Sequence, residues 1–225
     1  MDPYTAGMIQ VLIPLLFVTV SVVDAPARGT ADDRDATAAV DTTAGPLDAE
    51  IRALFDATSR LRREGKADSV LTEVDRLEGE ALAIADTTAL VALRTHRGRV
   101  LARTSRFADA ERALARALAA AEAAGDSTRL LEPLFRMVEV VDAQGRPPRV
   151  ERWMDRLLAR SVELGDAAYE GRVLVLMARR AMREGDLDGA QADLERARAA
   201  FTGDPGLRGD RVNAVFLLGL VHAQR

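Results

Sequence analysis

The sequence predicts an all-α protein built from repeated helix pairs, and three observations lead to this prediction. Ala, Leu and Arg dominate the composition, which suits helices exposed to water. Aromatic residues make up only 4% of the chain, and the Val/Ile-rich runs that strands need are few. Small and apolar residues also recur at a constant step of about 40 residues, called the repeat step below.

Charge and cysteine content exclude several classes of protein. The formal net charge is −4 and the only lysine is Lys66, which argues against a nucleic-acid binder with a basic patch or tail. The chain has no Cys, so disulfides, zinc fingers and thiol catalysis are excluded. The lack of Cys is compatible with either redox compartment and does not decide the localisation.

The N-terminus carries the only information on localisation. Residues 8–23 form an apolar run that is short for a membrane span, and Ala25 and Ala27 supply the small residues of a signal-peptidase site. We therefore expect residues 1–27 to be a signal peptide and the protein to be exported, to the periplasm or outside the cell. The preceding residues contain Asp2 and no basic residue, which leaves two alternatives: a membrane tether formed by residues 8–23, or a misassigned start or buried helix.

The next segment, residues 28–47, is small and polar, and buries too little apolar surface to offset the entropy of ordering it. It is predicted to be a flexible linker. The repeat domain is expected to occupy residues 48–225.

Turn-forming residues mark the repeat step most clearly. Small residues suited to a tight turn lie at Gly65, Ser105, Gly145 and Gly185. Asp residues close helical runs at the same step, at Asp86, Asp126 and Asp166.

Residues expected in the core share this register. They lie five, nine and twelve positions after each turn, and four positions before it. The four sets are Val70, Ala110, Val150 and Ala190; Val74, Leu114, Met154 and Leu194; Leu77, Ala117, Leu157 and Ala197; and Leu61, Leu101, Val141 and Ala181. This spacing puts one apolar face of each helix toward its neighbours.

Each unit is therefore predicted to contain helix A, a turn, helix B and a loop. The units are 51–90, 91–130, 131–170 and 171–210, followed by a partial repeat at 211–225. Because a single helix pair cannot bury its own apolar face, such units must stack.

The second and fourth units resemble tetratricopeptide repeats. The resemblance lies in Phe107-Ala108-Asp109-Ala110 and in Gly185-Asp186-Leu187-Asp188-Gly189-Ala190, and in the small residues Gly98 and Ala178 eight places into their units. It covers about residues 51–225. It implies a right-handed solenoid of antiparallel helix pairs whose A helices form the concave surface. The units are longer than the usual tetratricopeptide unit, and Pro147 replaces an aromatic residue, so a related helical hairpin repeat is the alternative.

The last segment is predicted to be an A helix without a following B helix. Phe216, Leu217, Leu220 and Val221 are then expected to be partly open. Either the sequence is part of a longer protein truncated at Arg225, or the final helix caps the stack by itself.

The residues offer little for catalysis. His96 and His222 lie in different units without a metal-binding partner at i+4, and both are expected to be partly exposed helix residues. The segment Asp186–Gly189 lacks the remaining ligands of a calcium loop and is expected to be a repeat turn. Trp153 is expected to pack rather than to act at a site. No catalytic, metal or cofactor residue is predicted, and the protein is expected not to be an enzyme.

Charge is distributed unevenly between the two helices of a unit. The A-helix windows carry a net charge of +7 and the B-helix windows a net charge of −7. Under the resemblance this implies a basic groove, in which the residues predicted to contact a partner are Arg62, Arg63, Arg99, Arg103, Arg136, Arg172, Arg179 and Arg183, with Phe55, Phe135, Val175 and Leu176 as apolar contacts. Because guanidinium groups pair well with carboxylates, the expected partner is a protein or peptide with an acidic segment or C-terminus. Solvated surface arginines are the alternative, and Glu132, Glu139 and Asp142 interrupt the stripe.

The function expected from the sequence is a non-catalytic scaffold for protein–protein interaction, with no nucleic acid and no cofactor. The alternative is the N-terminal sensing or assembly region of a longer signalling or hydrolytic protein. The sequence does not indicate the partner, the pathway or the oligomeric state.

Overall fold

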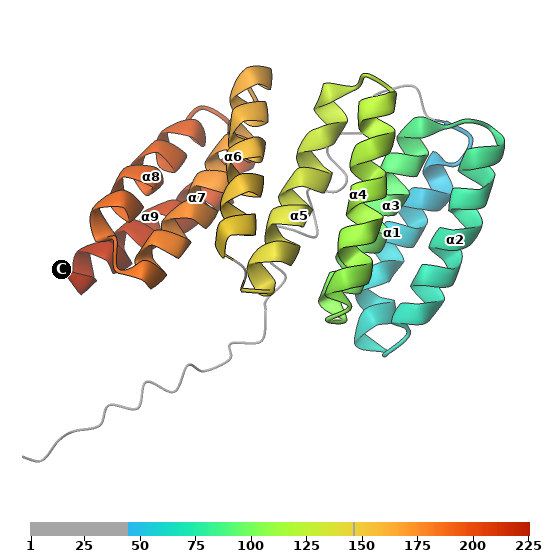
Figure 1. The fold of residues 1–225 in the computed structure, drawn as a ribbon, viewed down its shortest axis with the longest axis horizontal. Helices are drawn as coiled ribbons and strands as arrows, with labels where there is room; N and C mark the ends of the chain where they lie inside the picture. Colours follow the sequence, from blue (N-terminus) through green and yellow to red (C-terminus); the bar gives the residue numbers. More distant parts are fainter. Residues whose placement is uncertain (1–44, 146) are drawn as a thin grey trace, which may run out of the picture.

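The computed structural model describes residues 45–225 with the exception of Arg146, and these residues form an all-α stack without strands (Figure 1). The predicted signal peptide, its alternative as a membrane tether, and the predicted linker up to residue 44 lie outside the described residues. Leu47, at the end of the predicted linker, is buried in the core. The helices are α1 (Asp48–Arg63), α2 (Ala67–Ala83), α3 (Thr87–Arg103), α4 (Phe107–Ala123), η3 (Ser127–Leu130), α5 (Leu131–Ala143), α6 (Pro147–Leu164), α7 (Ala167–Glu184), α8 (Leu187–Ala200), η4 (Pro205–Leu207) and α9 (Arg208–Gln224).

Consecutive helices pack against one another, which confirms the all-α prediction and the pairing of neighbouring helices. Figure 1 shows two layers, with α2, α4 and α8 in front of α1, α3 and α9. Each odd-numbered helix also contacts the next odd-numbered one, from α1 to α9.

Left-handed backbone conformations end the helices at evenly spaced positions, two to each repeat step. Positive φ angles occur at Gly65, Ala85, Ser105, Gly125, Gly145, Gly165 and Gly185. At the ends other than Gly145 the following N–H bonds back to the carbonyl five positions earlier, as in Lys66 N to Leu61 O (2.8 Å) and Arg106 N to Leu101 O (2.9 Å). This is the hydrogen bond of a Schellman motif. The predicted A–B turns are confirmed, and the intervening B–A turns have the same geometry.

The Asp residues at the repeat step begin helices rather than end them. The Asp86 carboxylate accepts a hydrogen bond from Ala89 N (2.9 Å), and Asp166 accepts one from Tyr169 N (3.0 Å). Asp126 caps η3 through Thr128 N (3.1 Å) in the same way. The prediction that these residues close helical runs was wrong, because a carboxylate satisfies the free N–H groups of a helix start.

The predicted core is present. The twelve residues placed five, nine and twelve positions after the turns are all buried, as are Leu101 and Val141, while Leu61 and Ala181 are partly buried. Gly98 allows α3 and α4 to approach closely, since a Cβ at this position would lie 2.6 Å from Leu114 Cγ. Asp186 accepts a hydrogen bond from Gly189 N (2.9 Å) and caps α8, which confirms the repeat-turn interpretation of this segment.

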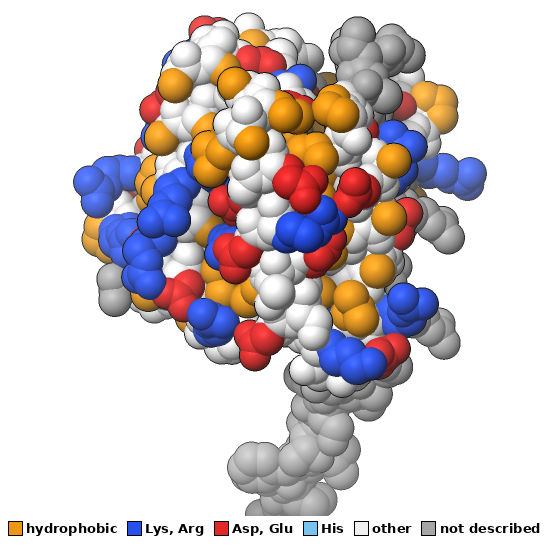
Figure 2. Space-filling model, turned by 90° about the vertical axis from the view of Figure 1, so that its right-hand side faces the viewer, with side chains coloured by type: hydrophobic (Ala, Val, Ile, Leu, Met, Phe, Trp, Pro, Cys, Tyr) orange, Lys and Arg blue, Asp and Glu red, His pale blue; other side chains and the backbone are white. Residues whose placement is uncertain are grey.

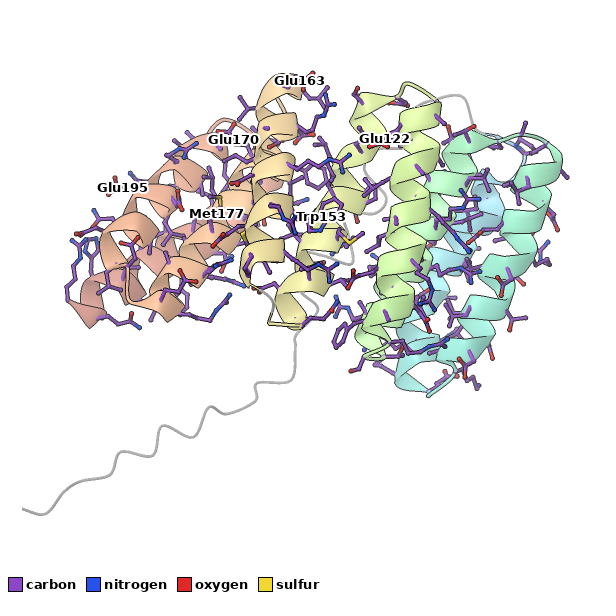
Figure 3. All side chains as sticks on the ribbon, viewed as in Figure 1. Glu122, Trp153, Glu163, Glu170, Met177 and Glu195 are labelled. Atoms are coloured by element: carbon purple, nitrogen blue, oxygen red, sulfur yellow. The ribbon has the colours of Figure 1, made fainter. Side chains whose placement is uncertain are left out.

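Trp153 is partly buried and packs against the hydrophobic core, as predicted. It lies on α6, with Glu122 on α4 across the gap between the ribbons (Figure 3). Arg156 lies over the Trp153 ring, 5.4 Å from its centroid, and forms an ion pair with Glu122. The two B helices are thereby linked across α5.

The two ends of the stack differ in polarity. Figure 2 views the end formed by α1 and α2, where acidic and basic side chains are interspersed. On α9, at the other end, Phe216 and Leu220 are exposed as expected, but Leu217 and Val221 are buried against α7 and α8. The prediction that Leu217 and Val221 are open was wrong, because they point back into the stack. No helix among residues 45–225, residue 146 excepted, is long and apolar enough to cross a membrane.

Candidate functional site

The surface formed by α1, α3, α5, α7 and α9 carries a series of polar contacts that link successive repeats, and it is called the odd-helix face below. The repeat step places residues of successive odd helices at the same position on this face. His96 and Arg136 are one such pair, and Glu132 and Arg172 are another. A polar group on one helix is thus a neighbour of the equivalent group on the next.

His96, on α3, is buried against α1, which corrects the prediction that it is partly exposed. Its ring stacks on Phe55 with centroids 4.0 Å apart. His96 Nε2 lies 2.8 Å from Thr58 Oγ1, and that hydroxyl donates its own proton to Leu54 O (2.8 Å). His96 Nδ1 lies 3.0 Å from Arg99 Nη2, which can only donate. The imidazole is therefore neutral, with its proton on Nε2.

The electrostatics agree with this tautomer. Burial, and then the charges of Arg99 and Arg136, hold the pKa of His96 well below its usual value. Protonation of Nδ1 would remove the acceptor of the Arg99 hydrogen bond and place two cations in contact. His96 is thus a structural group that holds Arg99 in position.

Arg136 occupies the centre of the face and is also buried, at 7% exposed. It donates from Nε to Glu132 (2.8 Å) and from Nη1 to Glu139 (2.9 Å), and it lies over the Phe135 ring. The Tyr169 hydroxyl donates to the other oxygen of Glu132 (2.5 Å). This group joins α5 to α7.

Glu132 remains ionised within this group. Desolvation raises its pKa, but the charge of Arg136 and the hydrogen bonds from Tyr169 and Arg136 outweigh that effect and leave the pKa below its ordinary value. Burial and the nearby Glu132 charge raise the pKa of Tyr169, so its hydroxyl stays protonated as a donor.

The arginines predicted on the C-terminal half of the face have partners within the protein. Arg172 donates to Asp210 on α9 (3.1 Å) and lies over the Tyr169 ring. Arg183 forms an ion pair with Asp142 (3.0 Å), and Arg179 contacts Asn213 (3.3 Å). Among the predicted apolar contacts, Phe135 and Val175 are buried, while Phe55 and Leu176 are half-buried.

At the other end of the face, three of the predicted arginines lie close together. Arg62 on α1 and Arg99 and Arg103 on α3 surround one pocket, together with Thr58, Ser59 and Val100. This set of residues is called the arginine pocket. Its volume of about 20 Å³ admits roughly one water-sized group. Three guanidinium groups and two hydroxyls line it, and no carboxylate does.

The sequence interpretation missed the pairing of Glu132 with Arg136 and Tyr169. The register contained a signal for it, since Glu132 and Arg136 are one turn apart on α5, in the spacing of a helical ion pair. Tyr169 gave no such signal, because its contact with Glu132 depends on how α7 lies against α5.

Comparison with known proteins leaves the family open. No protein-family model matches the chain, and no curated protein matches it. Residues 45–225, with residue 146 excepted, contain no cluster of three or more His, Cys, Asp or Glu side chains that could hold a metal ion.

Proposed function

We propose that this chain is a non-catalytic scaffold that binds an acidic segment of a partner protein on the odd-helix face, with the arginine pocket as the anchor. The observation that carries the proposal is the convergence of Arg62, Arg99 and Arg103, from two different helices, on one small pocket. A guanidinium fork matches the geometry of a carboxylate and can donate two parallel hydrogen bonds to it.

The density of positive charge supports this location. Three arginines from two helices line one small pocket, and no carboxylate residue is among its lining residues. A bound carboxylate would interact favourably with all three charges.

The pocket is also built to keep its shape. The hydrogen bond to His96 orients Arg99, and His96 is fixed in turn by Phe55 and Thr58. A cation held in place before binding loses less side-chain entropy when it binds an anion. The small volume suits the carboxylate end of an Asp, a Glu or a chain terminus rather than a whole apolar side chain.

The stacking of the helices suits a long partner. The proposed architecture is a tetratricopeptide-like right-handed solenoid with the odd helices on its inner, concave side. The direct contacts between successive odd helices support this, because helices on the inside of a curved stack lie closer together than those on the outside.

Binding of synthetic acidic peptides, measured by fluorescence anisotropy, tests the proposal. A peptide rich in Asp and Glu would be used in two forms, one with a free C-terminal carboxylate and one amidated. We expect Arg62→Glu and Arg103→Glu each to weaken binding by roughly tenfold or more, since a charged hydrogen bond contributes about 1.5–3 kcal/mol. Arg99→Glu is expected to have a similar effect, and Arg179→Glu a smaller one, because Arg179 lies outside the pocket.

Arg152→Glu on α6 is the matched control, because Arg152 is exposed and far from the pocket in the stack. Circular dichroism would verify that each variant folds. Equal affinity of the wild type, Arg62→Glu and Arg103→Glu for both peptides would rule out the arginine pocket as an anchor.

A further inference from the structure

Helix α9 carries the most prominent group of exposed apolar side chains in the described part of the chain. Val212 is 60% exposed, Val215 50%, Phe216 63% and Leu220 38%. Their spacing of three, four and eight positions from Val212 places them on one stripe of the helix. Residues 212–221 include no charged side chain. A stripe of this kind, rather than scattered single residues, marks an interaction surface.

The repeat register shows that this stripe is a surface for packing helices. Val175 lies one repeat step before Val215, at the equivalent position of α7, and is only 6% exposed because it is part of the core shared by α7, α8 and α9. In α3, α5 and α7 the residues at the equivalent positions are buried or partly buried, and each of these helices contacts the two helices that follow it. The open face of α9 therefore has the shape that accepts another helix.

Basic side chains border the stripe. A hollow of about 660 Å³ lies between α8 and α9, with Arg198 and Arg211 on its sides and Ala199, Thr202 and Val215 as its other lining residues. Within residues 45–225, Arg146 excepted, neither Arg198 nor Arg211 forms an ion pair. An occupant that places carboxylates beside an apolar stripe would satisfy both groups.

We propose that the open face of α9 binds an amphipathic α-helix of another protein, with Asp or Glu residues flanking its apolar stripe. The charges favour this occupant over a second copy of the chain. The only carboxylate side chain on α9 is Asp210, which already pairs with Arg172. Two α9 helices packed face to face would therefore bring arginines together without a carboxylate between them.

The chain itself supplies a probe of the right chemistry. A synthetic peptide of residues 66–86 contains the sequence of α2, which has the apolar stripe Val70, Val74 and Leu77 and a net charge of −4. A peptide of residues 147–164, from α6, is also amphipathic but has a net charge of +1 and serves as the matched basic control. Each would be labelled and titrated with the full chain.

We expect the acidic peptide to bind at least tenfold more tightly than the basic one, with an affinity that falls as salt is added. Phe216→Asp should weaken binding by tenfold or more, as should Arg198→Glu combined with Arg211→Glu. Ile84→Asp, at an exposed apolar position of the opposite end, should leave binding unchanged. All of these affinities would be measured in the Arg62→Glu background, in which the arginine pocket is disabled, so that binding at α9 is measured separately from binding at the pocket.

Three results would overturn the proposal. They are no binding of the acidic peptide to the wild type, binding that survives both Phe216→Asp and Val215→Asp, and equal binding of the two peptides. Light scattering of the wild type provides a further test. A dimer that Phe216→Asp dissociates would show that a second copy occupies the face instead. Because Phe216 and Val215 are exposed, their substitution should leave the helical circular dichroism signal intact.

Discussion

Ala85 and Ser105 hold backbone angles that glycine adopts at the equivalent positions of the other helix ends, and replacement by glycine is expected to stabilise the protein. Ala85 has φ +55° and an exposed side chain, so Ala85→Gly removes strain and almost no packing. The left-handed conformation costs an L-residue about 1–2 kcal/mol. Glycine also raises the entropy of the unfolded chain, which offsets about 0.4–1 kcal/mol of the relieved strain. The net gain is about 0.5–1 kcal/mol.

Urea and thermal unfolding followed by circular dichroism would measure this gain. For a chain of this size it corresponds to an increase in Tm of about 1–4 °C. The reverse change, Gly165→Ala, is the matched control. Gly165 has φ +65° and no atom near its missing Cβ, so only strain is added and stability should fall by a similar amount. Gly79→Ala, inside α2, should instead stabilise the protein, because glycine weakens a helix interior. A loss of stability in Ala85→Gly, or none in Gly165→Ala, would refute the reasoning.

Three further changes test packing and electrostatics. Gly171→Ala places a Cβ 2.4 Å from Phe201 Cε1 in a filled core. It should lower the free energy of unfolding, measured by urea titration, by about 1–3 kcal/mol. An unchanged urea midpoint would contradict the close approach of α7 and α8. Tyr169→Phe removes a hydrogen-bond donor to Glu132 and should lower the free energy of unfolding by about 1–2 kcal/mol. A smaller loss of stability when the same change is made in the Glu132→Gln variant would confirm that the two side chains are coupled. The pKa of His96 is lower in the folded protein than in the unfolded chain, so its contribution to stability is complete above about pH 6.5 and is lost as the pH falls below that value. The free energy of unfolding of His96→Phe should therefore depend less on pH than that of the wild type between about pH 7.5 and 5.5. Parallel plots of unfolding free energy against pH for the two proteins would contradict the buried neutral imidazole.

Much of the fold could be predicted from the sequence because the apolar residues repeat with a single register. Val70, Leu114 and Leu157 are buried where that register placed them, and Gly65 and Ser105 end helices as predicted. Asp86 was assigned to the wrong helix. An Asp between two helices looks the same in either role, and only the backbone geometry shows which N–H groups it caps.

The candidate site was predicted less completely. The sequence placed eight arginines in one groove, since it could count their charges but not their partners. In the structure Arg136 is buried between Glu132 and Glu139, while Arg62, Arg99 and Arg103 converge on one pocket. Ion-pair partners on the same helix can be predicted from their spacing in the sequence. Contacts between helices also depend on how far one helix is shifted along its neighbour. No periodic pattern in the sequence encodes those shifts.

The evenly spaced left-handed residues have a consequence for how such a chain can change in length. Loss or duplication of a single helix with its turn would shift every later helix into the opposite layer. Residues such as Arg136 and Glu132 would then leave the odd-helix face, and the surface would lose its continuity from that point on. A change of one complete repeat step removes or adds one helix from each layer and preserves the order of both. The architecture therefore permits growth only in whole hairpins, and the odd-helix face lengthens by the same increment.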